Sequence, residues 1–226
     1  MPGEHDGEDS LTQGSHGLAA ALYGRTRELH LQAERTGFVR EMLRGRAGRD
    51  GYVLYLRNLQ PVYRALEQGL ERHRSTPGLG PFAEPALYRS QALESDLVGL
   101  AGAGWHDALP ILREGHHYAQ CVEVAAAGAG VGLIGHAYTR YLGDLSGGQI
   151  LSRLLAKSLS LGPETLRFYA FPAIPDVEAF KASYRDRLDD AEGSIDAVDS
   201  LLDEAALAFE LNIDLSAAVQ AAVEAA

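Results

Sequence analysis

Apolar residues recur every three or four positions along most of this chain, the spacing that gathers them on one face of an α-helix. The clearest run consists of Val53, Leu56, Leu59, Tyr63, Leu66 and Leu70. Asp50 can cap the start of this helix, Pro61 predicts a kink inside it, and Ser75 to Gly78 predicts its end. The pattern therefore predicts one long helix that begins near residue 50.

The same periodicity predicts helices in several other segments. They lie near residues 84–100, 108–127, 130–160 (bent at its glycines), 176–191 and 194–213, and an N-terminal helix carries Leu18, Leu22, Leu29 and Ala33. No segment alternates apolar and polar residues as a half-buried strand does, and no internal repeat is present. The predicted fold is all-α.

A length of 226 residues without a visible internal boundary predicts one domain. We expect a disordered acidic tail over residues 1–17, a helical domain over 18–215 and a C-terminal tail over 216–226. No apolar run approaches the roughly 18 residues that span a bilayer, and the first residues are acidic. We therefore expect a soluble, cytoplasmic protein without a membrane anchor.

Charge and cysteine content narrow the possible functions. The net charge of −11 argues against nucleic acid as a partner, because such a surface requires a basic patch. Many of the 20 basic residues fall within Arg25–Arg49 and Lys181–Arg187. These stretches could converge on ligand carboxylates, which arginine binds in a bidentate manner. The lone Cys121 excludes an internal disulfide and a thiolate metal cluster.

The segment 135–150 combines an apolar, helix-like pattern with Gly143, Gly147, Gly148 and the carboxylate of Asp144. Each glycine costs a helix roughly 1 kcal/mol relative to alanine, so bare backbone must serve a purpose there. One such purpose is close approach to a flat ligand, with Asp144 as the polar end of a small gap.

Two other interpretations of this segment are open on its residues alone. Gly-Asp and Ser-Gly-Gly are common turn signals, so the segment could be a loop. Leu145 to Gln149 also resembles the signature loop of ABC-type ATPases, which binds phosphate. A P-loop would require a lysine after a glycine, and neither Lys157 nor Lys181 follows one. The similarity to the ATPase loop is therefore a chance match.

His30 flanks the apolar face of the N-terminal helix, and Glu34 follows one turn later. An imidazole that binds iron through one ring nitrogen usually donates the N–H of the other nitrogen to such a group. On spacing alone, a surface histidine beside an acidic neighbour is the favoured interpretation.

Together these two segments resemble the heme oxygenase family. The helix containing Leu29-His30-Leu31-Gln32-Ala33-Glu34 is similar to the family's proximal helix, and residues 136–149 match its distal motif throughout. The resemblance extends from about residue 18 to about residue 215, which would be the catalytic domain. It implies heme held between a proximal helix and a kinked, glycine-rich distal helix. It also implies cleavage of heme, both cofactor and substrate, to biliverdin, CO and ferrous iron with O2.

The resemblance assigns roles residue by residue. His30 would ligate the iron with Glu34 beside it, and Gly143, Gly147 and Gly148 would cover the opposite face of the heme. Asp144 would hold a water that relays a proton, positioned by Tyr63, Tyr118, Arg140 and Asn212. His136, His116 and His117 match no ligand position.

The heme propionates would be met by Arg27, Lys181 and Arg185, with Tyr138 near the same edge. Tyr23 departs from the family pattern, which has a basic residue there in the mammalian enzymes. The expected product is still the α isomer, biliverdin IXα.

Electrons must come from an external donor, a ferredoxin or a reductase, because no flavin, dinucleotide or iron–sulfur motif is present. A heme carrier that never turns over is the alternative, and it would need His30 but neither Asp144 nor the glycines. A thiaminase-like hydrolase with Cys121 as nucleophile is the third possibility.

Overall fold

The computed structural model describes residues 17–226; His5, His16 and most of the expected N-terminal tail lie outside this range. In the described part, helices account for almost all regular structure and no strand is present. The helices are α1 (Leu18–Arg35), α2 (Gly37–Leu43), α3 (Arg49–Arg72), α4 (Ser90–Ala101), α5 (Trp105–Ala108), α6 (Arg113–Ala125), α7 (Gly132–Ser158), α8 (Val177–Ala191) and α9 (Val198–Glu224). The predicted all-α fold is confirmed.

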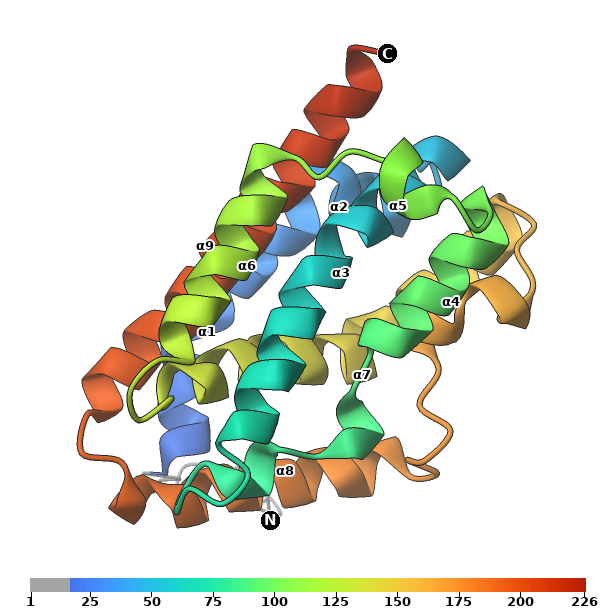
Figure 1. Ribbon diagram of the computed structural model, residues 1–226. Helices are drawn as coiled ribbons and strands as arrows, with labels where there is room; N and C mark the ends of the chain where they lie inside the picture. The colour runs from blue at the N-terminus through green and yellow to red at the C-terminus, as the bar shows by residue number, and fades with distance from the viewer. Residues whose placement is uncertain (1–16) are drawn as a thin grey trace, which may run out of the picture.

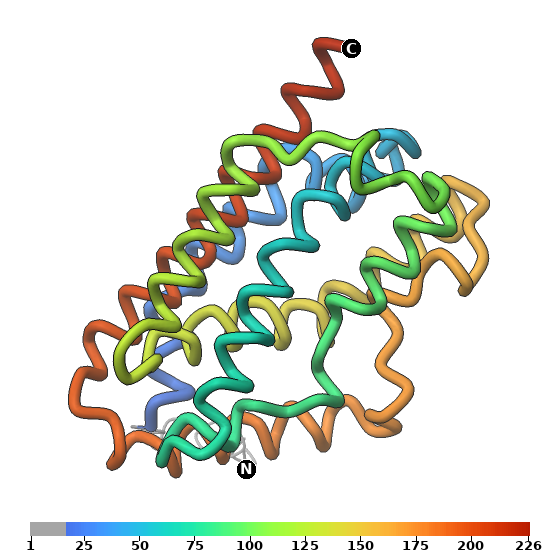
Figure 2. Tube along the Cα trace, viewed as in Figure 1, coloured from blue at the N-terminus to red at the C-terminus, as the bar shows by residue number. Residues whose placement is uncertain are grey.

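The long helices form a layered bundle around one apolar core (Figure 1). α3 packs against α6, and α6 packs against α9, so these three run side by side, while α7 crosses them (Figures 1 and 2). α8 closes one end of the bundle. α1 and α7 both pack on α9, which holds them on opposite sides of the cavity described below.

A glycine allows α7 and α9 to approach closely. A Cβ on Gly135 would lie 2.7 Å from the backbone nitrogen of Ala205, so no larger residue fits there. The Thr139 hydroxyl, one turn later, donates to the Ala205 carbonyl at 3.3 Å. This contact sets the position of α7, and with it the position of the glycine-rich segment.

The last helix continues beyond the predicted end at residue 213, and the residues expected to form a C-terminal tail are helical up to Glu224. Ser216 is buried, and its hydroxyl accepts from the Val39 N–H at 2.9 Å and donates to the Thr36 carbonyl at 3.0 Å. Gly37, with φ of +55°, brings the start of α2 against the same turn. The helix continues because α2 covers it, a long-range contact that local periodicity does not reveal.

Two other predicted boundaries and one predicted cap residue were also wrong. Two 3-10 turns, Gly80–Phe82 and Pro85–Leu87, precede α4, so the helix predicted at 84–100 starts only at Ser90. The helix predicted at 108–127 begins at Arg113, because Pro110 restricts the residue before it to extended backbone. Gly48, not Asp50, caps α3, and Asp50 lies in its first turn.

By length and composition, α9 could cross a membrane, contrary to the expectation that no segment would be apolar enough. Its packing against α1, α2, α6 and α7 accounts for the apolar residues, since a core helix passes the same test.

Candidate heme site

A cavity of about 500 Å³ lies between α1 and α7. Side chains from α2, α3, α8 and α9 complete its walls, and most of its lining is apolar. A volume in this range is typical of cofactor sites. The two segments that the sequence singled out therefore face the same space.

His30 and Glu34 line the α1 side of this cavity. The Nε2 atom of His30 lies 3.4 Å from the Glu34 carboxylate, and the ring centroids of His30 and Phe209 lie 5.8 Å apart. The His30 side chain is 53% exposed, so the imidazole is free to meet a ligand. The carboxylate beside it suits an imidazole that binds a metal through one nitrogen.

Gly143 and Gly147, four residues apart on α7, form a wall of bare backbone in the same cavity. A Cβ built at either position would meet no atom within 4 Å, so neither glycine is required by protein packing. Gly148 differs, because its Cβ would lie 3.1 Å from the Tyr169 ring. The first two glycines thus leave room for a ligand, and the third makes room for an aromatic side chain.

Asp144 lies between these glycines and is the centre of a buried polar network. The Tyr63 hydroxyl donates to its carboxylate, and a terminal nitrogen of Arg140 lies 3.4 Å from it. The Nε of Arg140 donates to the Tyr63 hydroxyl at 2.9 Å, and another of its nitrogens donates to the Asn212 amide oxygen at 2.6 Å. Four of the residues predicted to act together are therefore connected.

The environment of Asp144 favours proton exchange. Burial raises the pKa of this carboxyl above its ordinary value, while the Arg140 charge and the Tyr63 hydrogen bond oppose the increase. A buried carboxyl with a raised pKa, held by charged and hydroxyl partners beside a cavity, is a candidate for proton transfer.

Tyr118 and His136 lie behind this network. The Tyr118 hydroxyl is buried without a hydrogen-bond partner among the described residues, and burial raises its pKa. His136 is fully buried, and its Nε2 lies 2.9 Å from Glu204. Neither side chain lines the cavity.

The residues expected at the propionate edge are divided. Arg185, Tyr138 and Tyr23 line the cavity, whereas Lys181 reaches its rim through Ser146, whose hydroxyl lies 3.3 Å from the Lys181 ammonium. Arg27 lies outside the lining, with its Nε 3.4 Å from Glu28.

Four aromatic residues of the cavity wall were missed by the sequence analysis: Tyr55, Phe168, Tyr169 and Phe209. Phe168 and Tyr169 lie in a 3-10 turn without helical periodicity, so no local pattern marked them. The other two lie on helices, where they are indistinguishable from core residues.

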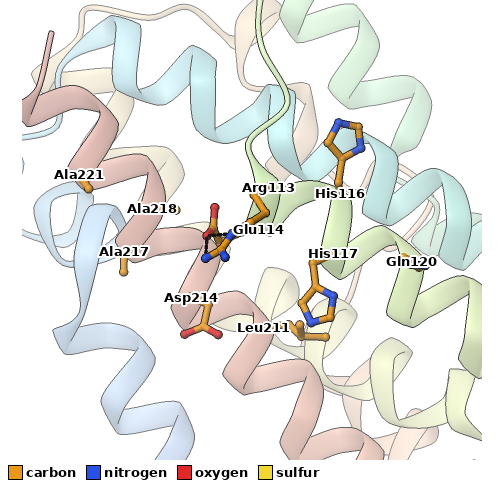
Figure 3. Close-up of a pocket in the computed structure, with 10 residues that line it drawn as sticks. All are labelled: Arg113, Glu114, His116, His117, Gln120, Leu211, Asp214, Ala217, Ala218 and Ala221. Atoms are coloured by element: carbon orange, nitrogen blue, oxygen red, sulfur yellow. Dashed lines mark hydrogen bonds and ion pairs between the residues drawn. The ribbon is translucent and has the colours of Figure 1, made fainter.

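A second cavity, of about 850 Å³, lies between α6 and α9 (Figure 3). Arg113 and Glu114 form an ion pair of 2.8 Å at its edge, and His117 and Asp214 extend into it. It has no glycine wall, and neither His30 nor Asp144 lines it. The larger cavity is therefore not the candidate site.

The fold and the cavity together define a class of protein. It is all-helical, and its cavity is lined by one imidazole from α1 and by bare helical backbone with a buried carboxyl from α7. The sequence model of the family described as "Heme oxygenase" matches residues 16–218. Heme oxygenase 1 of Rattus norvegicus is 37% identical over 216 residues, which cover 94% of this chain and 74% of the rat protein.

Solved structures agree with this comparison. Heme oxygenase-1 of the cyanobacterium Synechocystis in complex with heme matches with a TM-score of 0.87 and 35% identity, covering 92% of this chain and 95% of that chain. Heme oxygenase from Leptospira interrogans matches with a TM-score of 0.84 and 33% identity, covering 89% and 99%. The chain belongs to the heme oxygenase family, a family of heme-degrading oxidoreductases.

Proposed function

We propose that this protein cleaves heme to biliverdin IXα, CO and ferrous iron, with His30 as the proximal ligand. One observation carries the proposal: His30 and the Gly143–Gly147 wall with Asp144 line the same cavity from opposite helices. Bound heme would supply the iron that binds O2 and the ring that is oxidised. The test mixes the full-length protein with hemin, a reductant and air. Conversion of the heme spectrum to a biliverdin spectrum with release of CO supports the proposal, and a heme spectrum that persists contradicts it.

On the α1 side, the imidazole of His30 would bind the iron through one ring nitrogen while Glu34 accepts from the other. This arrangement selects one tautomer and one ring orientation. In other heme proteins a thiolate ligand donates electron density to the iron and so favours cleavage of the O–O bond. A neutral imidazole is a weaker electron donor, so His30 would favour this cleavage less.

On the α7 side, Gly143 and Gly147 would let the helix backbone lie directly over the ring. No side chain would then compete with a small ligand such as O2 for the space along this wall, and the backbone would limit where that ligand could lie. The glycines would direct the reaction sterically.

Asp144 would hold a water through its carboxylate and exchange a proton with it. Tyr63, Arg140 and Asn212 keep the carboxylate in place, as their hydrogen bonds support. Tyr118 would contribute through its position near Arg140, whose charge acts on the Tyr118 phenol.

The glycine wall makes a prediction that separates binding from folding. Gly147→Ala should leave the fold intact and raise the free energy of unfolding by up to about 1 kcal/mol, since its Cβ meets no protein atom. It should nevertheless weaken hemin binding or slow turnover, because the methyl group enters the cavity. Thermal unfolding and hemin titration measure the two effects.

Gly135→Ala is the matched control on the same helix. Its Cβ would collide with α9, so we expect a loss of about 1–3 kcal/mol in the free energy of unfolding. If Gly147→Ala bound and degraded hemin like the wild type, the close approach of α7 to the ring would be refuted.

Arg185 and Lys181, four residues apart on α8, would hold the heme propionates, with Tyr138 and Arg27 near the same edge. Replacing both by glutamine should change the ratio of biliverdin isomers, because the propionates then no longer set the rotation of the ring. Chromatography of the products measures the ratio. The Arg153→Gln/Lys157→Gln variant is the control, since it removes two exposed charges four apart on α7 outside the cavity. A ratio that changes in the Lys181/Arg185 variant but not in the control supports binding of the propionates by these two residues. A ratio that stays at the wild-type value in both variants rejects it.

Electrons would come from an external ferredoxin or reductase, and O2 would enter from solvent. We infer a soluble, cytoplasmic protein that uses α9 as a core helix and binds neither nucleic acid nor a membrane. Because the net charge is −11, an acidic donor protein would be attracted only to the arginines near the cavity. Salt screens exposed charges, so binding of the donor should weaken as the salt concentration rises.

A heme carrier is the second candidate, but a carrier has no need of a buried Asp144 network beside a bare wall. The third candidate, a hydrolase using Cys121, is disfavoured by two observations. Burial raises the pKa of the Cys121 thiol, which makes it a poor nucleophile. Its sulfur lies 3.8 Å from His117, outside the cavity.

A further inference from the structure

Three phenols lie near enough to Arg140 for its charge to act on them, and one of the three also lines the cavity. Tyr63 and Tyr118 are fully buried and lie behind the cavity wall. Tyr55 is only 4% exposed, yet it lines the cavity together with Arg140 and Asp144. Among these three phenols, Tyr55 is the one that a molecule in the cavity can touch.

The position of Tyr55 is fixed by its surroundings. It lies on α3 about two helical turns before Tyr63, whose hydroxyl accepts from Arg140. Phe38 of α2 packs against its ring, with the centroids 6.0 Å apart and the planes tilted by 38°. A ring held in this way presents its hydroxyl in one direction.

The charges near Tyr55 determine what its hydroxyl can do. Burial raises the pKa of the phenol, the positive charge of Arg140 opposes this increase, and Asp144 adds to it, so the hydroxyl keeps its proton at neutral pH. A guanidinium has N–H donors and no acceptor, so Arg140 cannot accept a hydrogen bond from the Tyr55 hydroxyl. The Tyr55 O–H is therefore left to donate to another group.

We propose that Tyr55 is a positioning residue of the α7 side of the cavity, donating its hydroxyl hydrogen to the water that Asp144 holds. This inference rests on the proposed function, because it concerns the space above bound heme. An ionised carboxylate only accepts hydrogen bonds and a phenol donates one, so the pair offers a water both partners that it needs. Tyr55 thereby stabilises negative charge on an oxygen atom or anion in this space.

The test compares full-length wild-type protein with Tyr55→Phe, each loaded with hemin. Two titrations followed by visible absorption report a hydrogen-bond donor near the iron: the acid–alkaline transition of the ferric protein and the binding of fluoride. Loss of one donor should raise the pH midpoint by about half a unit to one unit and weaken fluoride about three- to tenfold. The histidine-ligated spectrum should stay unchanged.

Tyr52→Phe is the matched control. Tyr52 lies three residues earlier on α3, is fully buried, has no hydrogen-bond partner within the described range and does not line the cavity. The same loss of a hydroxyl should change neither titration. A merely structural effect of removing a buried phenol would appear in both variants.

The outcomes are distinct. If Tyr55→Phe binds heme with histidine ligation and gives the same two titrations as the wild type, this inference is overturned and the proposed function stays intact. Equal shifts in both variants overturn it as well. Wild-type protein that binds hemin without histidine ligation overturns the proposed function and this inference together. If Tyr55→Phe does not fold, Tyr55→Leu removes the same hydroxyl and repeats the test.

Discussion

Replacing His30 by alanine is expected to abolish histidine ligation of heme and to reduce biliverdin formation below detection. The imidazole is the one histidine side chain that lines the cavity in the described part of the chain. Without it, hemin should still enter the apolar cavity but bind loosely, with a water or no ligand on the α1 side. The visible spectrum of the hemin complex and the rate of biliverdin formation measure the two effects.

The fold should survive this change. His30 is half exposed and its contacts are to Glu34 and Phe209, so the free energy of unfolding should stay within about 0.5 kcal/mol of the wild type. Added imidazole should restore part of the wild-type spectrum by occupying the space that the side chain left.

His117→Ala is the control for His30→Ala, because it removes an exposed histidine from the cavity between α6 and α9. We expect the wild-type spectrum and the wild-type rate. A histidine-ligated spectrum that persists in His30→Ala would assign the ligand elsewhere and remove His30 from its role.

The second large effect is expected from Asp144→Asn, which should lower the rate of biliverdin formation by about 100-fold or more. Asparagine retains an oxygen that accepts from Tyr63 and Arg140, but it cannot take up and return a proton. Hemin affinity and histidine ligation should therefore stay close to those of the wild type. Single-turnover absorption measurements separate the loss of turnover from any loss of binding.

Asp144→Ala tests the structural part of the same residue. It leaves the buried Arg140 guanidinium without its carboxylate partner, and breaking a buried pair in this way costs about 3–5 kcal/mol. Asp214→Asn, in the cavity between α6 and α9, is the matched control and should degrade heme normally. A full biliverdin yield from Asp144→Asn would contradict the proton relay.

Local sequence patterns were sufficient for the secondary-structure class and for the grouping of the α7 residues that line the cavity. The apolar spacing of three and four residues predicted the long helices α3 and α7, because each helical turn repeats the same contact with the core. Residues 136–149 likewise bring Arg140, Gly143, Asp144 and Gly147 together within two turns of one helix. These positions follow from the geometry of a single helix, so the sequence alone was enough to predict that the four residues lie close together.

Contacts between distant segments were not predictable in this way. Glu67 on α3 accepts from the Arg89 and Ser90 N–H groups, and Asp96 on α4 accepts from the Arg167 N–H at 3.0 Å and the Phe168 N–H at 2.8 Å. These buried carboxyls connect α3, α4 and the turn that carries Phe168. Nothing in the sequence near either residue identifies its partners.

Contacts between distant segments determine which helix lies on which side of the cavity. The sequence by itself determined that His30 and Asp144 lie on helices and which neighbours share their turns, because a helix relates residues three and four apart. Only the tertiary structure decided that Tyr55 lies beside Arg140, that Arg185 rather than Arg27 lines the cavity, and that α9 continues to Glu224 under α2. These depend on how helices pack, and packing is decided by the shapes of all the buried side chains together.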